Sequence, residues 1–292
     1  MFSKPRLGRS AVALTLALLA AACSRTDPAN PALWHVEGPQ GQQAWLFGTI
    51  HALPRPVAWR TPRVDAALRQ ASLLMVEIAD LNNDGATRAV YNRLAHSPDQ
   101  PPLESRVPER LRPALAQLLS KAGLKPDGFA DTETWASALL LGHAAQGDAE
   151  DAAHGVDRAL LSANHLPVSE FEGAQKQLSL FDSLPESAQR TMLASVIEGA
   201  PKAPEDTKAL EEAWRRGNMK WIAAQTSSGM LTDPVLRKQL YSGRNQAWES
   251  AITTAMAHGQ KPFVAVGAAH MAGPDGLPAL LAAHGYHVTR VE

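Results

Sequence analysis

The sequence is poor in cysteine and in aromatic side chains. It contains one cysteine, Cys23, among 292 residues. A single cysteine excludes an intramolecular disulfide framework and any zinc site that is built from several thiolates. Aromatic residues make up only 5% of the chain, which argues against a surface on which single-stranded nucleic acid stacks.

Neither sign of charge dominates the chain. It has 28 Lys and Arg residues against 29 Asp and Glu residues. Nucleic-acid-binding domains usually carry a clustered basic face, so we expect no nucleic-acid partner. A hydrophobic content of 45% and a charged content of 20% are typical of a folded globular chain. The length suffices for one large domain or two small ones.

The N-terminal apolar run is too short for a membrane-spanning helix, which takes about 20 residues. The first ten residues carry Lys4, Arg6 and Arg9 and no acid, and a mainly apolar segment follows over residues 11–22. A basic segment, a short apolar segment and small residues in this order indicate a secretory signal peptide over residues 1–22.

The end of this segment, residues 19–23, reads Leu-Ala-Ala-Ala-Cys and resembles the lipobox of bacterial lipoproteins. The resemblance implies cleavage before Cys23, lipidation of its thiol, and a tether over residues 23–31. Ser24, where Asp would be a retention signal, implies the outer membrane of a Gram-negative bacterium. We expect a lipoprotein anchored there by its lipid and facing the periplasm. The alternative is an ordinary cleaved signal with an incidental cysteine.

Extended apolar segments lie near both ends of the chain, and helical periodicity prevails between them. The predicted strands are residues 32–37, 43–49, 72–78, 167–172, 261–267 and 286–291. The predicted helical insertion covers about residues 100–258. The sequence therefore predicts one α+β domain over residues 32–292. Its single mixed sheet would draw strands from both chain ends, and the insertion would cover that sheet.

Two stretches repeat the order strand, Gly-x-x-His, helix, strand. Gly48 and His51 end the strand of the first copy, and Gly267 and His270 end that of the second. The pattern is weak alone, but the rim of an open α/β sheet is where catalytic groups lie. Glycine permits a sharp turn, often with positive φ, and a close approach of the histidine to a cavity. Such a histidine is suited to metal binding or general-base catalysis, and the alternative is a buried histidine bonded to the backbone.

Three glutamates follow or interrupt apolar runs. Glu77 lies in the run of residues 72–78, where an unpaired buried carboxylate would cost several kcal/mol. The alternative for Glu77 is a position at the rim, facing water. Glu170 and Glu172 lie in a similar strand, and because alternate residues share one face, both or neither should reach one site.

Together these residues resemble the TraB/GumN family, which is related to the Tiki membrane metalloproteases and, more distantly, to erythromycin-esterase-like and ChaN-like proteins. The resemblance covers about residues 33–292. The matching segments are residues 45–54, 76–77, 155–157, 166–172, 177–178, 244–245 and 266–273. Phe171 and Met271 stand where the family usually has leucine, and both keep the apolar character.

The resemblance implies a divalent-metal hydrolase. His51 and His270 would be metal ligands, and Glu77 and Glu172 would complete the set, one of them also as general base. Arg244 would stabilise the developing oxyanion. The metal would lower the pKa of a bound water and polarise the scissile carbonyl. A set of imidazoles and carboxylates without thiolates suits Mn, Fe, Co or Zn.

The same resemblance leaves the substrate and the activity open. The Tiki relatives imply a peptide or protein substrate, whereas the ChaN-like relatives imply a haem-type ligand-binding lipoprotein. A third alternative is an inactive scaffold.

Other residues carry weaker signals. Asp157 is interpreted as an acid at a helix start, favoured by the helix dipole, and His154 as structural or solvated. The sequence has no Gly-x-Ser-x-Gly motif that would indicate serine catalysis.

Overall fold

The structure is a computed structural model that describes residues 27–81, 84–147 and 151–292. The predicted signal peptide and the lipidation site Cys23 lie outside the described residues. Within the described residues, no helix combines the length and the apolarity that a membrane crossing requires.

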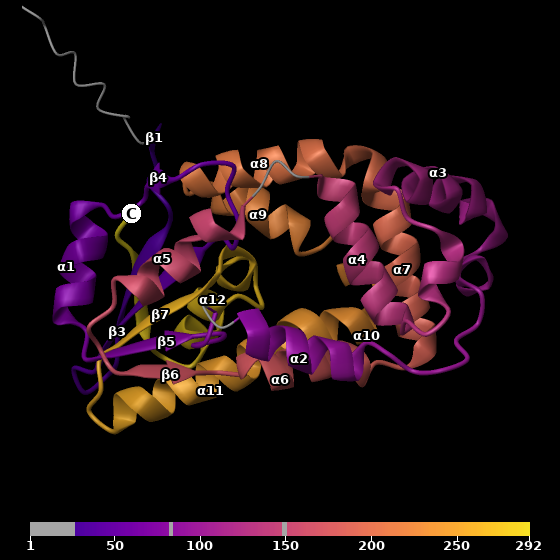
Figure 1. The fold of residues 1–292 in the computed structure, drawn as a ribbon. Helices are drawn as coiled ribbons and strands as arrows, with labels where there is room; N and C mark the ends of the chain where they lie inside the picture. The colour runs from indigo at the N-terminus through magenta and orange to yellow at the C-terminus, as the bar shows by residue number, and fades with distance from the viewer. Residues whose placement is uncertain (1–26, 82–83, 148–150) are drawn as a thin grey trace, which may run out of the picture.

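A six-stranded mixed sheet forms one half of the molecule, in the strand order β6-β5-β7-β3-β2-β8 (Figure 1). The strands are β2 (Leu33–Glu37), β3 (Gln43–Thr49), β5 (Leu73–Val76), β6 (Val168–Glu170), β7 (Pro262–Gly267) and β8 (His287–Arg290). β6, β5, β7 and β3 are parallel, whereas β2 is antiparallel to both β3 and β8. The predicted α+β class, with one mixed sheet drawn from both chain ends, is confirmed.

The strands of the two Gly-x-x-His copies are direct neighbours at the centre of the sheet. β3 and β7 pair in parallel, with Thr49 opposite Gly267. Every residue of β7 is buried, as expected for a strand whose two sheet faces are both covered. Both copies therefore leave the sheet at the same edge.

Helices cover both faces of the sheet. Val64 of α1 (Pro62–Gln70) and Leu160 of α5 (Val156–Ser162) belong to the apolar core on one face. On the other face, α11 (Gly243–Ala257) and α12 (Leu277–Ala283) form the second core. Each face buries the apolar side chains that alternate along the strands.

The helical insertion forms the other half of the molecule around its own apolar core (Figure 1). Its helices are α3 (Arg112–Ala122), α4 (Thr134–Gln146), α6 (Gly173–Asp182), α7 (Glu186–Gly199), α8 (Ala203–Arg215), α9 (Met219–Gln225) and α10 (Pro234–Arg237). α2 (Asp84–Leu94) precedes the insertion in sequence and packs against α6. Short 3₁₀ turns are η1 (Leu103–Arg106), η2 (Glu109–Leu111), η3 (Pro126–Phe129), η4 (Ala152–His154), η5 (Ala200–Lys202) and η6 (Gly229–Thr232). The indole Nε1–H of Trp214 in α8 donates to the carbonyl of Gly48, 2.8 Å away, and so joins the two halves.

Local signals in the sequence mark several helix ends. Thr61 caps α1 by accepting from the N–H of Val64, and Gly123 ends α3 with φ +66°.

Residues 27–31, which the sequence assigns to a tether, lie against the body. β1 (Asp27–Pro28) pairs in parallel with β4 (Val57–Ala58), and Ala29 is buried. The N–H of Asn30 donates to the carbonyl of Arg215 over 2.7 Å. These are backbone contacts, which the polar composition of the segment does not reveal.

A π-helical turn, Lys238–Ser242, joins α10 to α11 without a break. The N–H of Gly243 donates to the carbonyl of Lys238, and a Cβ on Gly243 would lie 2.6 Å from that oxygen. Glycine therefore permits the wider turn. π turns insert an extra residue into a helix and are frequent at functional sites.

Candidate functional site

All five residues predicted for the site lie at the edge where the four parallel strands end. Each strand leads into one of them: β3 into His51, β5 into Glu77, β6 into Glu172, and β7 into His270 of the 3₁₀ turn η8 (Ala268–Met271). Arg244 joins them from α11 and bonds to Glu77, Glu172 and His270. Open α/β sheets place their ligand sites at this edge.

His51 is exposed and is held by Asp157. Its Nδ1–H donates to Asp157 Oδ2 over 2.8 Å, and the hydroxyl of Thr49 donates to the other oxygen of the same carboxylate. The charge of Asp157 raises the pKa of His51 to about 9. The side chain of His51 is 66% exposed. The raised pKa favours the imidazolium form of His51 at neutral pH, and no described residue forms a hydrogen bond with its Nε2.

Asp157 does more than begin a helix. It lies in the first turn of α5, as predicted, but its buried carboxylate also orients His51. Burial would raise the pKa of Asp157, but the neighbouring His51 and the hydroxyl of Thr49 lower it below its usual value. The match of residues 155–157 to the family pattern was the sequence signal for this role.

His270 contrasts with His51 because it is buried. Its Nδ1 lies 2.6 Å from Asn245 Oδ1, and the Asn245 amide is oriented by donating to the carbonyl of Asp275 over 2.7 Å. His270 therefore carries its hydrogen on Nδ1, and its Nε2 lone pair faces Arg244. Burial lowers the pKa of His270 to about 3, so this imidazole is neutral at neutral pH. From the sequence, Asn245 is known only as part of a segment that matches the family.

Every N–H donor of Arg244 has an acceptor. Its Nε and Nη2 bond to the two oxygens of Glu172 at 2.9 and 2.8 Å, and Nη2 also bonds to Glu77 Oε2 at 2.8 Å. Nη1 meets His270 Nε2 at 3.3 Å and the carbonyl of Leu240 at 3.4 Å. Because a guanidinium has five N–H groups, none is left for a substrate oxyanion in this arrangement. Here Arg244 holds the carboxylates in place.

An aromatic ring supports this cluster from α11. The Trp248 ring centroid lies 4.5 Å from that of His270 and 4.6 Å from the Arg244 guanidinium carbon. Its indole Nε1–H donates to Glu172 Oε1 over 3.2 Å. Trp248 belongs to the apolar core of this face and also contacts three members of the site, a role that the sequence does not reveal.

The expectation that both or neither of Glu170 and Glu172 would reach one site was wrong, because only Glu172 does. β6 ends at Glu170, so the alternation of a strand does not extend to Glu172, whose φ is −135° and ψ −48°. Glu172 turns inward to Arg244, and its carboxylate is 2% exposed. Glu170 instead accepts from the N–H of Ala79 over 2.9 Å.

Glu77 faces the site from just beyond β5, rather than from inside the strand. Its Oε1 accepts from the N–H of Gly267 over 2.8 Å, and Oε2 accepts from Arg244. Burial would raise the pKa of Glu77, but the two histidines, Arg244 and this N–H together lower it. Glu77 is therefore buried, paired and ionised.

The two motif glycines allow close packing rather than an unusual turn. Neither Gly48 nor Gly267 has positive φ, so that part of the expectation was wrong. A Cβ on Gly48 would lie 3.0 Å from the Cα of Ala268. A Cβ on Gly267 would lie 3.2 Å from His51 Nε2 and 3.4 Å from Glu77 Oε1. The close approach is therefore confirmed, and it places His51 and Glu77 around one point.

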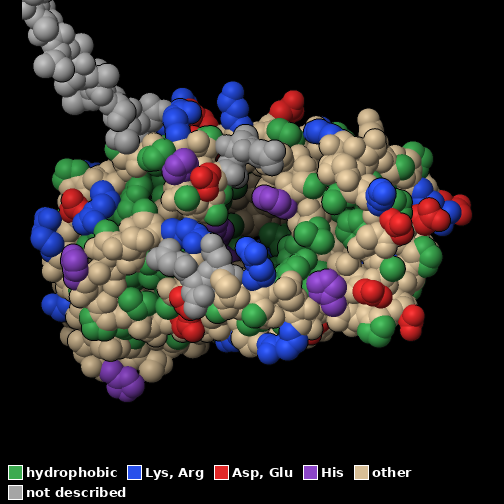
Figure 2. Space-filling model, viewed as in Figure 1, with side chains coloured by type: hydrophobic (Ala, Val, Ile, Leu, Met, Phe, Trp, Pro, Cys, Tyr) green, Lys and Arg blue, Asp and Glu red, His purple; other side chains and the backbone are tan. Residues whose placement is uncertain are grey.

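A cavity of about 190 Å³ adjoins His51 and Glu77. Ile78 and Gln177 also line it, and no described residue donates to the buried Oε1 of Gln177. The space-filling view shows the molecule hollowed between its two halves, with His and hydrophobic side chains around the hollow (Figure 2). Water or a small substrate group can reach this side of the site.

The predicted metal ligands are of suitable kinds but are not grouped around one point. Imidazole nitrogens and carboxylate oxygens suit Mn, Fe, Co or Zn. In this arrangement the carboxylates and His270 surround Arg244 instead. The described part of the chain contains no group of three or more His, Cys, Asp or Glu side chains that could hold a metal ion. The metal stays a prediction.

Comparison with known proteins gives the relationship. Residues 32–290 match the model of the TraB/PrgY/gumN family. Two curated relatives are uncharacterized proteins called YbaP, from Escherichia coli K12 and Shigella flexneri. Each is 28% identical over 254 residues, which are 83% of this chain and 89% of the relative. No solved structure matches. The predicted resemblance is confirmed: the chain belongs to the TraB/PrgY/gumN family.

Proposed function

We propose that this protein is a hydrolase in which Glu77 acts as general base and His51 as general acid. One observation carries the proposal. The carboxylate of Glu77 and the imidazole of His51 face the same point above Gly267, and both line one cavity. The lowered pKa of Glu77 and the raised pKa of His51 favour opposite protonation states in the two groups. A base and an acid in opposite protonation states are what the addition of water to a carbonyl and the departure of its leaving group require.

The proton transfers balance within this pair. Glu77 accepts a proton from water as the water oxygen attacks the carbonyl carbon. The Nε2–H of His51 donates its proton to the departing nitrogen or oxygen as the bond to carbon breaks. Transfer of the proton from Glu77 to His51 then restores both groups. General acid–base catalysis of this kind contributes about 10²–10⁴-fold in rate.

The remaining residues position the pair. Asp157 orients the His51 ring and keeps it protonated. Arg244 holds the Glu77 carboxylate, and it is itself held by Glu172 and by neutral His270. Removing Arg244 would leave the buried carboxylates of Glu77 and Glu172 without this cation, which is strongly destabilising.

The substrate we propose is an amide or ester carbonyl compound of the cell envelope. The peptide or protein part of this proposal rests on the resemblance to the Tiki proteases, and the envelope location rests on the predicted lipoprotein signal. The divalent metal rests on the same resemblance, and no step above uses it. Metal analysis of the purified protein, with activity measured before and after dialysis against EDTA, tests the metal separately.

The proposal is tested by Glu77→Gln, which keeps the shape of the side chain and removes its basicity. We expect turnover of p-nitrophenyl acetate and of fluorescein-labelled casein to fall by about 10²–10⁴. Glu170→Gln is the matched control, because Glu170 ends the neighbouring strand but bonds to Ala79 outside the cluster. It should keep full activity.

Circular dichroism gives the fold of each variant. A folded Glu77→Gln protein with wild-type turnover contradicts the proposal, and an unfolded one makes Glu77 a structural residue. The haem-type and scaffold alternatives give their own results. A Soret band on haem titration without any hydrolysis favours the binding protein. The absence of both the Soret band and hydrolysis favours the scaffold.

A further inference from the structure

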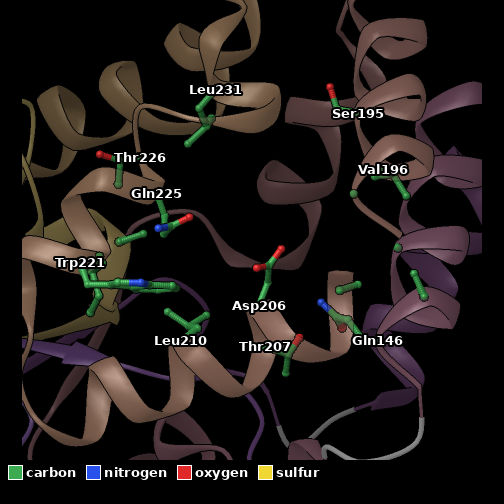
Figure 3. A pocket seen from close by; sticks show the side chains of 16 residues that line it. Gln146, Ser195, Val196, Asp206, Thr207, Leu210, Trp221, Gln225, Thr226 and Leu231 are labelled. Carbon is green, nitrogen blue, oxygen red and sulfur yellow. The ribbon is translucent and has the colours of Figure 1, made fainter. Parts of the chain in front are cut away.

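A second cavity, of about 430 Å³, lies among the helices of the insertion (Figure 3). We call it the helical cavity. It is lined by α4, α7, α8 and α9, with Ala269 of η8 at one side; the residues used below are Asp206, Leu210, Trp221, Gln146, Gln225 and Ala269. Figure 3 shows Trp221 and Leu210 on one side of the space, with Gln146 and Val196 on the other. Its volume falls in the range of small-molecule sites, about 300–1,000 Å³.

The lining of the helical cavity is mainly apolar, with a few polar groups. Trp221 and Leu210 provide large apolar surfaces, and Leu210 is 37% exposed. The amides of Gln146 and Gln225 add neutral donors and acceptors. Asp206 is the one charged residue among the described residues that line it. A mainly apolar lining with a few placed polar groups is typical of ligand pockets, and a lone carboxylate disfavours an anionic occupant.

The helical cavity and the proposed catalytic site share the turn η8. Ala269 is exposed and lines the cavity, whereas the next residue, His270, is buried among the site residues. α8 is tied to the end of β3 through the bond from Trp214 to Gly48, three residues before His51. The turn η8 therefore borders both the helical cavity and the proposed catalytic site.

We propose that the helical cavity binds the apolar part of the substrate. The substrate class is a carbonyl compound with an extended aliphatic or aromatic group that is uncharged or positively charged. This assignment rests on the proposed hydrolase function for its catalytic half. The proposal that the helical cavity binds a ligand depends only on the residues that line it. Ligand binding and hydrolysis can therefore be disproved separately.

Binding of the neutral dye N-phenyl-1-naphthylamine, followed by its fluorescence, tests the cavity without any turnover. Leu210→Trp fills part of the helical cavity from α8. It should weaken dye binding by about tenfold, because the indole occupies the space in which the dye would bury its apolar surface. Leu140→Trp is the matched control. Leu140 is also an exposed helical leucine, at 44%, but it lies on α4 outside the lining. Equal dye affinities in both variants overturn the cavity as a binding site.

The charge of the cavity is tested by Asp206→Asn with a second dye, anionic 8-anilinonaphthalene-1-sulfonate. Removal of the carboxylate should strengthen binding of the anionic dye by about three- to fivefold, the size expected for one partly solvated charge. Binding of the neutral dye should stay unchanged. An unchanged affinity for the anionic dye overturns the charge preference.

Hydrolysis links the cavity to the catalytic site. We expect Leu210→Trp to lower kcat/KM for p-nitrophenyl octanoate by about tenfold and to leave that for p-nitrophenyl acetate unchanged, because only the longer acyl chain reaches the cavity. A parallel change for both esters overturns the shared substrate path. Wild-type protein that binds the dye but cleaves neither ester overturns the hydrolase function and leaves the cavity as a binding site.

Discussion

The two Gly-x-x-His segments have the same sequence pattern and end neighbouring strands, but they present histidines of opposite character. His51 is exposed and bonded to a carboxylate, and its pKa is raised to about 9. His270 is buried and bonded to an amide, and its pKa is lowered to about 3. The acceptor at Nδ1 and the access of water therefore decide what each histidine can do, and the shared motif does not.

This difference separates two accounts of the site. If both imidazoles bind one metal, they contribute equally, since each would donate an Nε2 lone pair to the ion. If His51 is the acid and His270 only supports Arg244, their contributions to turnover are unequal. The following predictions use this contrast, from the largest expected effect to the smallest.

The largest effect is expected on turnover. His51→Gln should reduce ester hydrolysis by about 10²–10⁴, because it removes the general acid from an exposed position without disturbing the core. His270→Gln should keep most of the turnover and instead lower the free energy of unfolding by about 1–3 kcal/mol, since it disturbs a buried hydrogen bond. Initial rates and urea unfolding of both variants measure this. Equal loss of turnover, together with loss of a bound metal from both, would support the metal account.

The second effect is on how stability depends on pH. Unfolded histidine titrates near pH 6.5, but buried His270 stays neutral down to about 3. The unfolded state alone then gains a proton, so stability falls as the pH drops below 6.5, by up to about 1.4 kcal/mol per pH unit. His51 has the opposite sign, because its raised pKa stabilises the fold fully below pH 6.5, and this contribution is lost as the pH rises through about 9.

Urea unfolding from about pH 5 to pH 9.5 separates these two contributions. His270→Gln should flatten only the acid side of the curve, and His51→Gln only the alkaline side. Because His51 is largely exposed, water screens its interaction and the alkaline effect should be the smaller. If His270→Gln flattened the alkaline side of the stability curve and His51→Gln the acid side, the contrast between the two histidines would be contradicted.

The third effect is an exchange of the two environments. Asp157→Asn removes the charge at Nδ1 of His51 and should lower the pKa of His51 towards its usual 6.5. Asn245→Asp places a carboxylate at Nδ1 of His270 and should raise the pKa of His270. NMR titration of the histidine Cε1–H signals measures both values. Unchanged pKa values in both variants would show that the Nδ1 acceptor does not determine the difference.

The smallest effects are expected at the glycines. Gly48→Ala brings a Cβ to 3.0 Å from backbone atoms of Ala268, so it should cost about 1–3 kcal/mol of stability. Gly267→Ala meets the His51 and Glu77 side chains at 3.2 and 3.4 Å, and these can shift by a few tenths of an ångström. We expect lower turnover with nearly unchanged stability in the second variant. Thermal unfolding and initial rates of both variants test this. Equal losses of stability in Gly48→Ala and Gly267→Ala would contradict the expected difference.

The positions of the central strands were predictable because buried parallel strands are continuous apolar runs. Residues 43–49 and 261–267 have this pattern, and they form β3 and β7. Helix caps such as Thr61 and Gly123 are likewise local signals. α2 and the pairing of β1 with β4 were not predicted, since neither carries a strong periodic or apolar pattern.

The five site residues were predictable from strand ends and family resemblance, whereas their partners were not. Asp157 is 106 residues from His51 in sequence, and no spacing rule connects a helix-start acid to a strand-end histidine. Asn245 and Trp248 lie one helical turn apart on α11 and look like ordinary helix residues in sequence. Their roles depend on the tertiary contact between α11 and η8. The same contact explains why Arg244 has no free donor.

The π-helical turn at Lys238–Ser242 sets the rotational phase of α11. An α-helix turns by about 100° per residue, so the extra residue in this turn decides which side of α11 faces the sheet. Deleting one residue there would restore an ordinary helix and swing Arg244, Asn245 and Trp248 away from the strand ends together. The guanidinium of Arg244, the amide of Asn245 and the ring of Trp248 are thus aligned together by a single added residue earlier in the same helix.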